Sequence, residues 1–253
     1  MHNIISPAIL YWGTPVVLIT TENEDGTYNI APMSSAWWLG HRCMLGLSAM
    51  SQTTQNMLRT KKCVLNLPSQ DMTSHINLLA RTTGANPMSE FKVRTGYSYV
   101  KDKFQQAKLT PQKSDLVGPP RILECPVQME AEVMDHHEMM KDLSDRKGLT
   151  LAIEVKILRI HVQDELRLQG HENRIDTDKL HPLFMVFQEY YGMCSKRLEE
   201  SHLARIDESN YRALTRSNEV PQGADTDMVK EEVLPVVEAV GGTEEMEEIE
   251  AVW

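Results

Sequence analysis

Apolar and polar residues alternate over much of this sequence, which predicts a chain built mostly of β-strands. Residues 15–21 (PVVLITT) are rich in β-branched side chains and are typical of a buried strand. Asp25-Gly26 then predicts a hairpin turn, so that the following residues return as the partner strand. Further apolar runs predict strands at residues 43–49 and 62–67.

The strictest alternation occurs in two later segments, residues 127–133 and 151–157. Each segment predicts a strand with one buried face and one solvent-facing side, and Gln128 and Glu130 are expected on the solvent-facing side. After Ile157 the apolar positions shift by one residue, which predicts a β-bulge because such a slip moves side chains to the opposite face.

Helical patterns are confined to short segments. Residues 53–60 lack glycine and proline and predict a helix with Ser51 or Thr53 as its N-cap. Apolar residues at helical spacing predict a second helix at residues 71–80, and the rest of residues 81–120 is expected to be loop with a short helix near residues 101–107. Many strands with short helices between them favour a closed or nearly closed barrel of Greek-key type.

Negative charge is concentrated at the C-terminal end of the 253-residue chain. Residues 219–253 hold eleven acidic residues and one lysine, which accounts for the net charge of −10. After an apolar segment at residues 181–187 we expect a charged, helical stretch up to about Tyr211. The interpretation is one domain over residues 1–205, followed by a weakly ordered acidic tail over residues 206–253.

Composition also narrows the classes of partner and location. The body of the chain is close to neutral, so no basic surplus favours nucleic-acid binding. No apolar run of about 18 residues occurs, and the N-terminus has no basic region typical of a signal peptide, so no membrane partner is expected. The four cysteines are far apart and form no CxxC pair, which is typical of reduced thiols in a cytoplasmic protein.

A first candidate binding segment is NIAPMSS, residues 29–35. Its small side chains would let backbone donors and acceptors approach the edge of a flat ring, and Pro32 would stiffen that approach. Considered alone, the segment is explained better as a small-residue strand return with a bulge, because such turns are common.

A second candidate is SQTTQN, residues 51–56, where hydroxyl groups cluster at the start of the expected helix. A phosphate is bound well by hydroxyl donors together with the free N–H groups of a helix N-terminus. Considered alone, however, these residues are explained better as a multiply capped helix. The usual nucleotide-binding sequences, a Walker loop or a GxGxxG, do not occur.

Other candidates are weaker. His136-His137-Glu138 predicts a solvated turn rather than a metal site, because adjacent residues point in different directions. Trp37-Trp38 is more typical of packing in a core or an interface than of stacking on a ligand. No catalytic side chain and no metal ligand is therefore assigned from the residues themselves.

The order of these segments resembles the flavin reductase-like family, the FMN-binding split barrels. The family's FMN-binding half is resembled by an ordered series of segments: TT and DG before NIAPMSS, then an apolar strand, then SQTTQN before KKCVLNL. The family's second half is resembled by KFQQAKLTP and VGPPRILECPVQMEAEV. The resemblance spans residues 15–162 and continues more weakly to residue 192. It implies a split-barrel homodimer with FMN between the subunits.

The resemblance also implies roles for particular residues. The first segment would border the isoalloxazine ring and the second would hold the ribityl phosphate. The implied cofactor-binding residues are Asn29, Ala31, Pro32, Met33, Ser34, Ser35, Met50, Ser51, Thr53, Thr54 and Asn56.

The implied activity is NAD(P)H-dependent reduction through FMN, in which the cofactor performs the chemistry. The sequence departs from the family at Gly148-Leu149-Thr150, where members that reduce free flavin often carry Gly-x-His. Gln52 stands where a cation could meet the phosphate, and the candidates for that charge are Arg59, Lys61 and Lys103. An FMN-binding electron carrier or sensor without turnover is the first alternative. A protein that has lost FMN and works through its acidic tail is the second.

Overall fold

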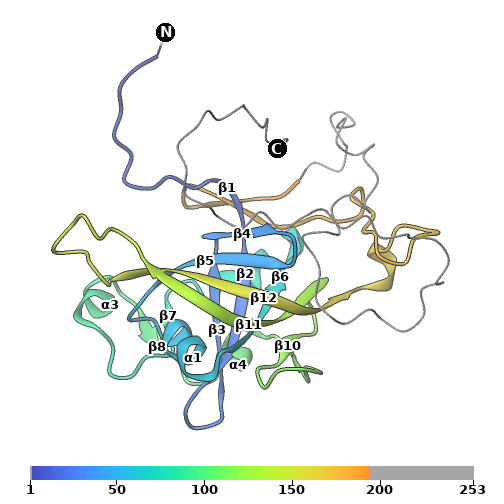
Figure 1. Cartoon of the computed structure of the whole chain (residues 1–253), viewed down its shortest axis with the longest axis horizontal. Helices are drawn as coiled ribbons and strands as arrows, with labels where there is room; N and C mark the ends of the chain where they lie inside the picture. The colour runs from blue at the N-terminus through green and yellow to red at the C-terminus, as the bar shows by residue number, and fades with distance from the viewer. Residues whose placement is uncertain (1, 194–253) are drawn as a thin grey trace, which may run out of the picture. The chain divides into compact units, whose positions relative to one another are not determined.

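A computed structural model describes residues 2–193, and Figure 1 shows their arrangement. These residues all belong to the first of two compact units, which runs from Met1 to Arg216. The acidic tail expected at residues 206–253 and the helical stretch expected up to Tyr211 lie outside the described residues. Within the described part, no helix combines the length and the apolar character needed to cross a membrane.

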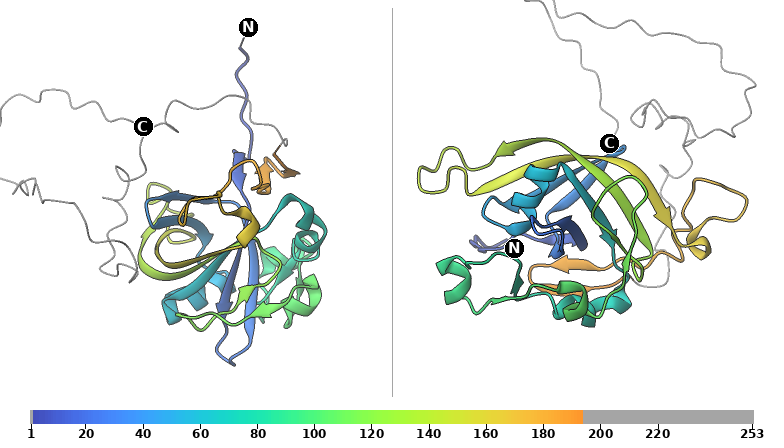
Figure 2. Two further views of the ribbon diagram at one scale, coloured as in Figure 1. Left: turned by 90° about the vertical axis from the view of Figure 1, so that its right-hand side faces the viewer. Right: turned by 90° about the horizontal axis from the view of Figure 1, so that it is seen from below.

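Seven antiparallel strands form the main sheet, which lies across the molecule in the order β3 (Tyr28–Met33), β2 (Val17–Glu22), β6 (Lys62–Leu67), β11 (Val127–Glu138), β12 (Thr150–Val162), β5 (Arg42–Ser48) and β4 (Ala36–Leu39). The strands expected at residues 15–21, 43–49 and 62–67 are confirmed as β2, β5 and β6. The sheet curls but does not close on itself, so β3 and β4 remain its two edges (Figure 2).

The β2–β3 hairpin turns where the sequence predicts it. Gly26 has a φ of +78°, a left-handed conformation that glycine adopts at little cost. The carboxylate of Asp25 accepts a hydrogen bond from the backbone N–H of Thr27 at 3.1 Å, which closes the turn. Both strands then pair along their full length.

The long β11–β12 hairpin contains the expected bulge. Glu130 pairs with Arg159 and the next residue of β11, Ala131, pairs with Ile157, so Leu158 is the extra residue. The shift therefore lies next to Ile157, where the apolar pattern of the sequence slips.

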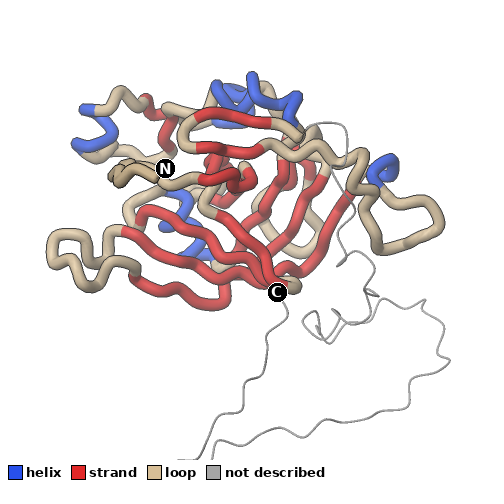
Figure 3. The backbone as a smooth tube through the Cα atoms, turned by 90° about the horizontal axis from the view of Figure 1, so that it is seen from above, coloured by secondary structure: helices blue, strands red, loops and turns tan. Residues whose placement is uncertain are grey.

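The remaining elements are short, as the tube in Figure 3 shows. The helix expected at residues 53–60 is confirmed as α1 (Gln52–Thr60), and the one near residues 101–107 as α4 (Lys103–Ala107). The helix expected at residues 71–80 is shorter, and an additional helix lies in the expected loop region. These elements are η1 (Gln70–Met72), α2 (Thr73–Asn77), α3 (Glu90–Arg94) and η2 (Asp164–Leu166), with the small strands β1 (Trp12–Pro15), β7 (Thr82–Thr83), β8 (Ser98–Tyr99), β9 (Pro111–Gln112), β10 (Arg121–Ile122), β13 (Phe184–Val186) and β14 (Glu189–Tyr191).

Two apolar clusters cover opposite faces of β2. Val17 and Ile19 pack with strands β5, β6, β11 and β12 and with Met57 of α1. Leu18 faces the other way and packs with Ile30 of β3, Phe104 of α4 and their neighbours. Burial on both faces explains why residues 15–21 form a continuous apolar run rather than an alternating one.

The expectation that Gln128 and Glu130 face solvent is wrong. Both side chains are buried, because the segment of residues 111–125 packs over that face of β11. The amide of Gln128 donates to the carbonyl of Ile122 at 2.6 Å, and the Glu130 carboxylate accepts from the backbone N–H of Asp115 at 3.0 Å. The polar residues that alternate with apolar ones in β11 therefore form a second buried face, which packs against a loop through hydrogen bonds.

Candidate functional site

The two candidate binding segments meet at Asn29. This side chain of β3 is 2% exposed, and its Nδ2 donates to Thr53 Oγ1 in the first turn of α1 at 2.9 Å. Residues 29–35 and 51–56 are thus held side by side, although 24 residues separate the two partners. The pairing depends on the hairpin that returns β3 along β2 and on the short connection between β5 and α1.

The start of α1 is capped by its own side chains, as the capping interpretation predicts. Ser51 is the N-cap, and its Oγ accepts from the backbone N–H of Thr54 at 3.1 Å. The Thr54 hydroxyl donates to the carbonyl of Ser48 at 2.8 Å. No acidic residue lies in the first turn, so the partial positive charge of this helix end has no carboxylate beside it within the helix.

Asn56 has a different environment from the other members of the second segment. It is fully buried, and its Nδ2 donates to Thr21 Oγ1 at 3.0 Å and to Asn23 Oδ1 at 2.8 Å. These contacts tie α1 to the β2–β3 hairpin, so the side chain orients both binding segments. Met50, just before the N-cap, is 67% exposed.

The first segment continues from the end of β3 into β4. Ala31, Pro32 and Met33 are half-buried, and Ser34 is buried. The Ser35 hydroxyl lies 2.7 Å from the hydroxyl of Tyr11, a contact that the sequence alone did not indicate.

One buried polar atom at the junction has no partner among the described residues. Asn29 Oδ1 accepts no hydrogen bond there, although Nδ2 of the same amide is paired. A Cβ on Gly84 would lie 2.6 Å from this atom, so the loop after β7 approaches Asn29 more closely than a larger residue permits. Sequence reasoning missed Gly84, because nothing local in the sequence places it beside residue 29.

Two lysines lie near this junction. Lys103 of α4 is 3% exposed and its Nζ donates to the carbonyl of Ile30 at 2.9 Å. Burial, and next the charge on Lys92, lower the pKa of Lys103 to about 7. Lys92 of α3 is half-buried and donates to Thr83 Oγ1 at 2.6 Å, and burial lowers its pKa as well.

Thr150, which the resemblance matches to the family's histidine, begins β12 and pairs with Ser48 of β5. Ser48 also accepts from the backbone N–H of Ser51 at 3.1 Å. Thr150 therefore lies across one strand from the residues that lead into α1.

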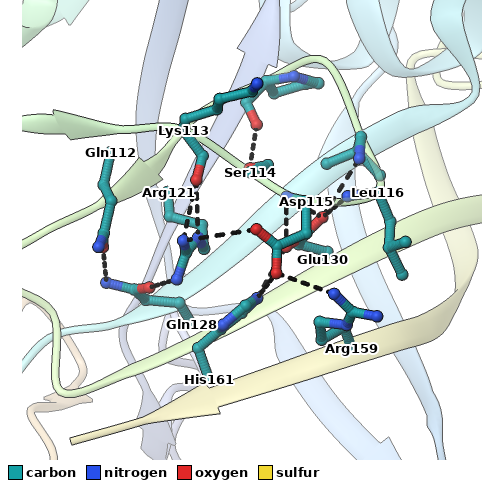
Figure 4. A network of polar contacts seen from close by, with 12 residues as sticks. Gln112, Lys113, Ser114, Asp115, Leu116, Arg121, Gln128, Glu130, Arg159 and His161 are labelled. Carbon is teal, nitrogen blue, oxygen red and sulfur yellow. Dashed lines mark hydrogen bonds and ion pairs between the residues drawn. The ribbon is translucent and has the colours of Figure 1, made fainter.

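A second polar cluster lies on the covered face of β11 (Figure 4). The Glu130 carboxylate accepts backbone N–H groups of Asp115, Leu116 and Val117 and lies 2.7 Å from Nε2 of His161. Burial raises the pKa of Glu130, but these hydrogen bonds outweigh it and hold the pKa below its usual value.

Asp115, Glu130 and His161 are grouped closely enough to hold a metal ion. Arg159 binds the Asp115 carboxylate at 2.8 Å, and Arg121 lies 4.0 Å from it. The protein thus supplies its own cations, and we interpret the cluster as an ion-pair network that anchors a loop. His136 and His137, expected in a solvated turn, are exposed as expected but lie on β11.

A model of the flavin reductase like domain matches residues 11–191 of the chain. The chain belongs to the flavin reductase-like family. The uncharacterized protein YdfE of Bacillus subtilis (strain 168) is 38% identical over 189 residues, which cover 75% of this chain and 88% of that protein. Family membership places the protein among flavin-related oxidoreductases and implies a flavin cofactor.

Solved structures agree on the fold. Flavoredoxin of Desulfovibrio vulgaris (Miyazaki F) has a TM-score of 0.63 at 19% identity, covering 81% of this chain and 98% of that one. A protein of Shewanella frigidimarina NCIMB 400 described as having a split barrel domain has a TM-score of 0.57 at 18% identity, covering 75% and 87%. The expected split barrel is confirmed, with the open edges described above.

The junction residues fit the flavin that the family implies. Asn29 offers a buried acceptor without a partner, and the capped start of α1 offers backbone N–H groups. A flavin nucleotide carries ribityl hydroxyl donors next to an anionic phosphate, which are the complementary groups.

Proposed function

We propose that the protein binds FMN at the junction of β3 and α1 and passes electrons through it from NADH or NADPH. The observation that carries this proposal is the Asn29–Thr53 hydrogen bond, since it unites the two segments that the family resemblance assigns to the ring and to the phosphate.

The chain's own residues would bind and orient the flavin. Bound FMN would supply two-electron chemistry between the nicotinamide and an acceptor. The half-buried Ala31, Pro32 and Met33 leave backbone close to the surface for the ring, and Ser51 and Thr53 stand at the phosphate end. Because no proton has to leave a side chain in this half of the reaction, no catalytic acid or base is assigned.

We expect flavin reduction by NADH or NADPH to be slow because of Thr150. A threonine hydroxyl is shorter than an imidazole and carries no charge, so it offers the nicotinamide nucleotide a weaker partner than histidine does. Under anaerobic conditions, we expect NADH or NADPH to bleach the visible absorbance band of the FMN-loaded protein. The rate should rise almost linearly with nicotinamide concentration, because binding is weak.

Thr150→His should steepen that rise, and Thr110→His, at an exposed position outside the binding segments, serves as the control that should leave it unchanged. If dithionite bleaches the flavin but neither nicotinamide does at any concentration, the reductase proposal fails. An FMN-binding electron carrier, which the Thr150 position favours, then takes its place.

We also propose a homodimer in the cytoplasm. Trp37 on edge strand β4 is 58% exposed and Trp12 on β1 is 68% exposed, and large exposed tryptophans are typical of interfaces. Cys43, Cys63 and Cys125 are free thiols, which supports a reducing compartment.

A further inference from the structure

Lys103 is a buried amino group without a matching anion among the described residues. A lysine ammonium has three donors, and the carbonyl of Ile30 accepts only one of them. No ion pair joins Lys103 to a carboxylate within residues 2–193. Lysine is almost never buried to this degree unless it is paired.

Lys92 adds a second unmatched charge to the same place. Its ammonium donates to Thr83 Oγ1 and lies 5.9 Å from the ring centroid of Tyr97, and it too has no carboxylate partner in the described part of the chain. Its charge is close enough to Lys103 to disfavour the protonated form of that lysine. Two neighbouring cations in a partly desolvated place repel each other unless an anion lies between them.

The surroundings connect these lysines to the flavin junction through short contacts. Lys103 binds the carbonyl of Ile30, whose chain neighbour Asn29 contacts α1 through Thr53. Lys92 binds Thr83, and the next residue, Gly84, approaches the unpaired Oδ1 of Asn29. Both cations are thus one residue away from the contacts that unite β3, α1 and the loop after β7.

We propose that Lys103 and Lys92 bind the phosphate monoester of FMN, adding side-chain cations to the partial positive charge at the start of α1. This inference rests on the proposed FMN binding. A phosphate monoester carries between one and two negative charges at neutral pH, which matches two lysines. Both lysines therefore bind this dianion rather than an uncharged part of the flavin.

The test compares two ligands that differ only in the phosphate. FMN and riboflavin are titrated into the full chain and into Lys103→Met, Lys92→Met and Lys101→Met, following the quenching of flavin fluorescence. Lys101 is the matched control, because it is the same residue type two positions before Lys103, is exposed and pairs with Asp25 at 3.1 Å.

Lys103→Met and Lys92→Met should each weaken FMN binding by about ten- to a hundredfold, the range for a lost hydrogen bond to a charged group. Riboflavin affinity should stay within about twofold in every variant, the scatter of a few tenths of a kcal/mol. Lys101→Met should change neither ligand. If Lys103→Met and Lys92→Met keep the FMN-to-riboflavin ratio of the unaltered chain, the phosphate lies elsewhere and the inference is overturned.

A measurement on the unaltered chain separates this inference from the proposed function. Inorganic phosphate is added without flavin, and the Lys103 side-chain NMR signal is followed with pH. An upward shift of the Lys103 pKa supports the anion site even if no flavin binds, in which case the FMN proposal alone fails. FMN binding without any effect of phosphate or of the two lysine substitutions rejects the anion site and leaves FMN binding intact.

Discussion

At the scale of single residues, the site depends on polar groups whose burial the sequence does not predict. Asn29 belongs to a segment that the sequence identifies, but its contact with Thr53 depends on how β3 and α1 meet. Lys103 follows Asp102, the N-cap of α4, and would be exposed on an isolated helix. Its burial is a product of tertiary packing, so the sequence could name Lys103 only as one of three candidate cations, with Arg59 and Lys61.

The low pKa of Lys103 makes a prediction for FMN binding. Lys103 without ligand loses its proton near pH 7, whereas a bound phosphate favours the protonated form. FMN affinity should therefore be highest between about pH 6, where a phosphate monoester becomes a dianion, and pH 7. Above pH 7 it should fall by up to about tenfold per pH unit.

Riboflavin affinity should stay flat over the same range, and so should FMN affinity in Lys103→Met. Without ligand, the lowered pKa should make the free energy of unfolding increase from about pH 7 to about pH 10.5, since the unfolded chain keeps the proton longer. An FMN affinity that does not change between pH 7 and 9 would contradict a charged contact with Lys103.

At the scale of elements, most strands were predictable, because their apolar patterns are local. Residues 62–67 match β6 at both ends, and the slip after Ile157 coincides with the bulge. The exposure of the polar face of β11 was not predictable. Whether Glu130 meets water or a loop depends on residues 111–125, which pack there through contacts distant in sequence.

Glu130 is expected to stabilise the fold through that loop. Its pKa is below the usual value, so its stabilising contribution is present at neutral pH and is lost as the pH falls below about 4.5. Glu130→Gln should lower the free energy of unfolding at pH 7 by about 2 kcal/mol, the range for a hydrogen bond to a charged group. It should also flatten the loss of stability in acid.

Urea unfolding between pH 3 and pH 8 measures both effects. Glu132→Gln is the matched control on the same strand, because its partly exposed pair with Lys62 at 2.9 Å should contribute less than about 1 kcal/mol. Equal losses for the two variants would show that Glu130 is an ordinary surface carboxylate.

At the scale of the whole molecule, the open edges of the sheet favour association. β4 is an edge strand, and it carries the exposed Trp37 and Leu39. An exposed, apolar edge invites pairing with another chain, and a symmetric dimer would cover the β4 edge of both copies.

Trp37→Lys should convert the proposed homodimer into a monomer, because a charged side chain at the centre of an apolar interface is costly. Light scattering on the full chain gives the mass directly. The family resemblance puts FMN between subunits, so the monomer should also retain less flavin. A dimer of unchanged mass and flavin content would place the interface on another surface.

The central claim is that residues 29–35 and 51–56 together hold a flavin. The most direct measurement is a titration of the purified full chain with FMN, following the visible flavin band and the protein-bound fraction. We expect saturable binding of one FMN per chain, which Asn29→Ala weakens while the chain stays folded. If neither FMN nor FAD binds to a folded chain, the junction of β3 and α1 is not a flavin site.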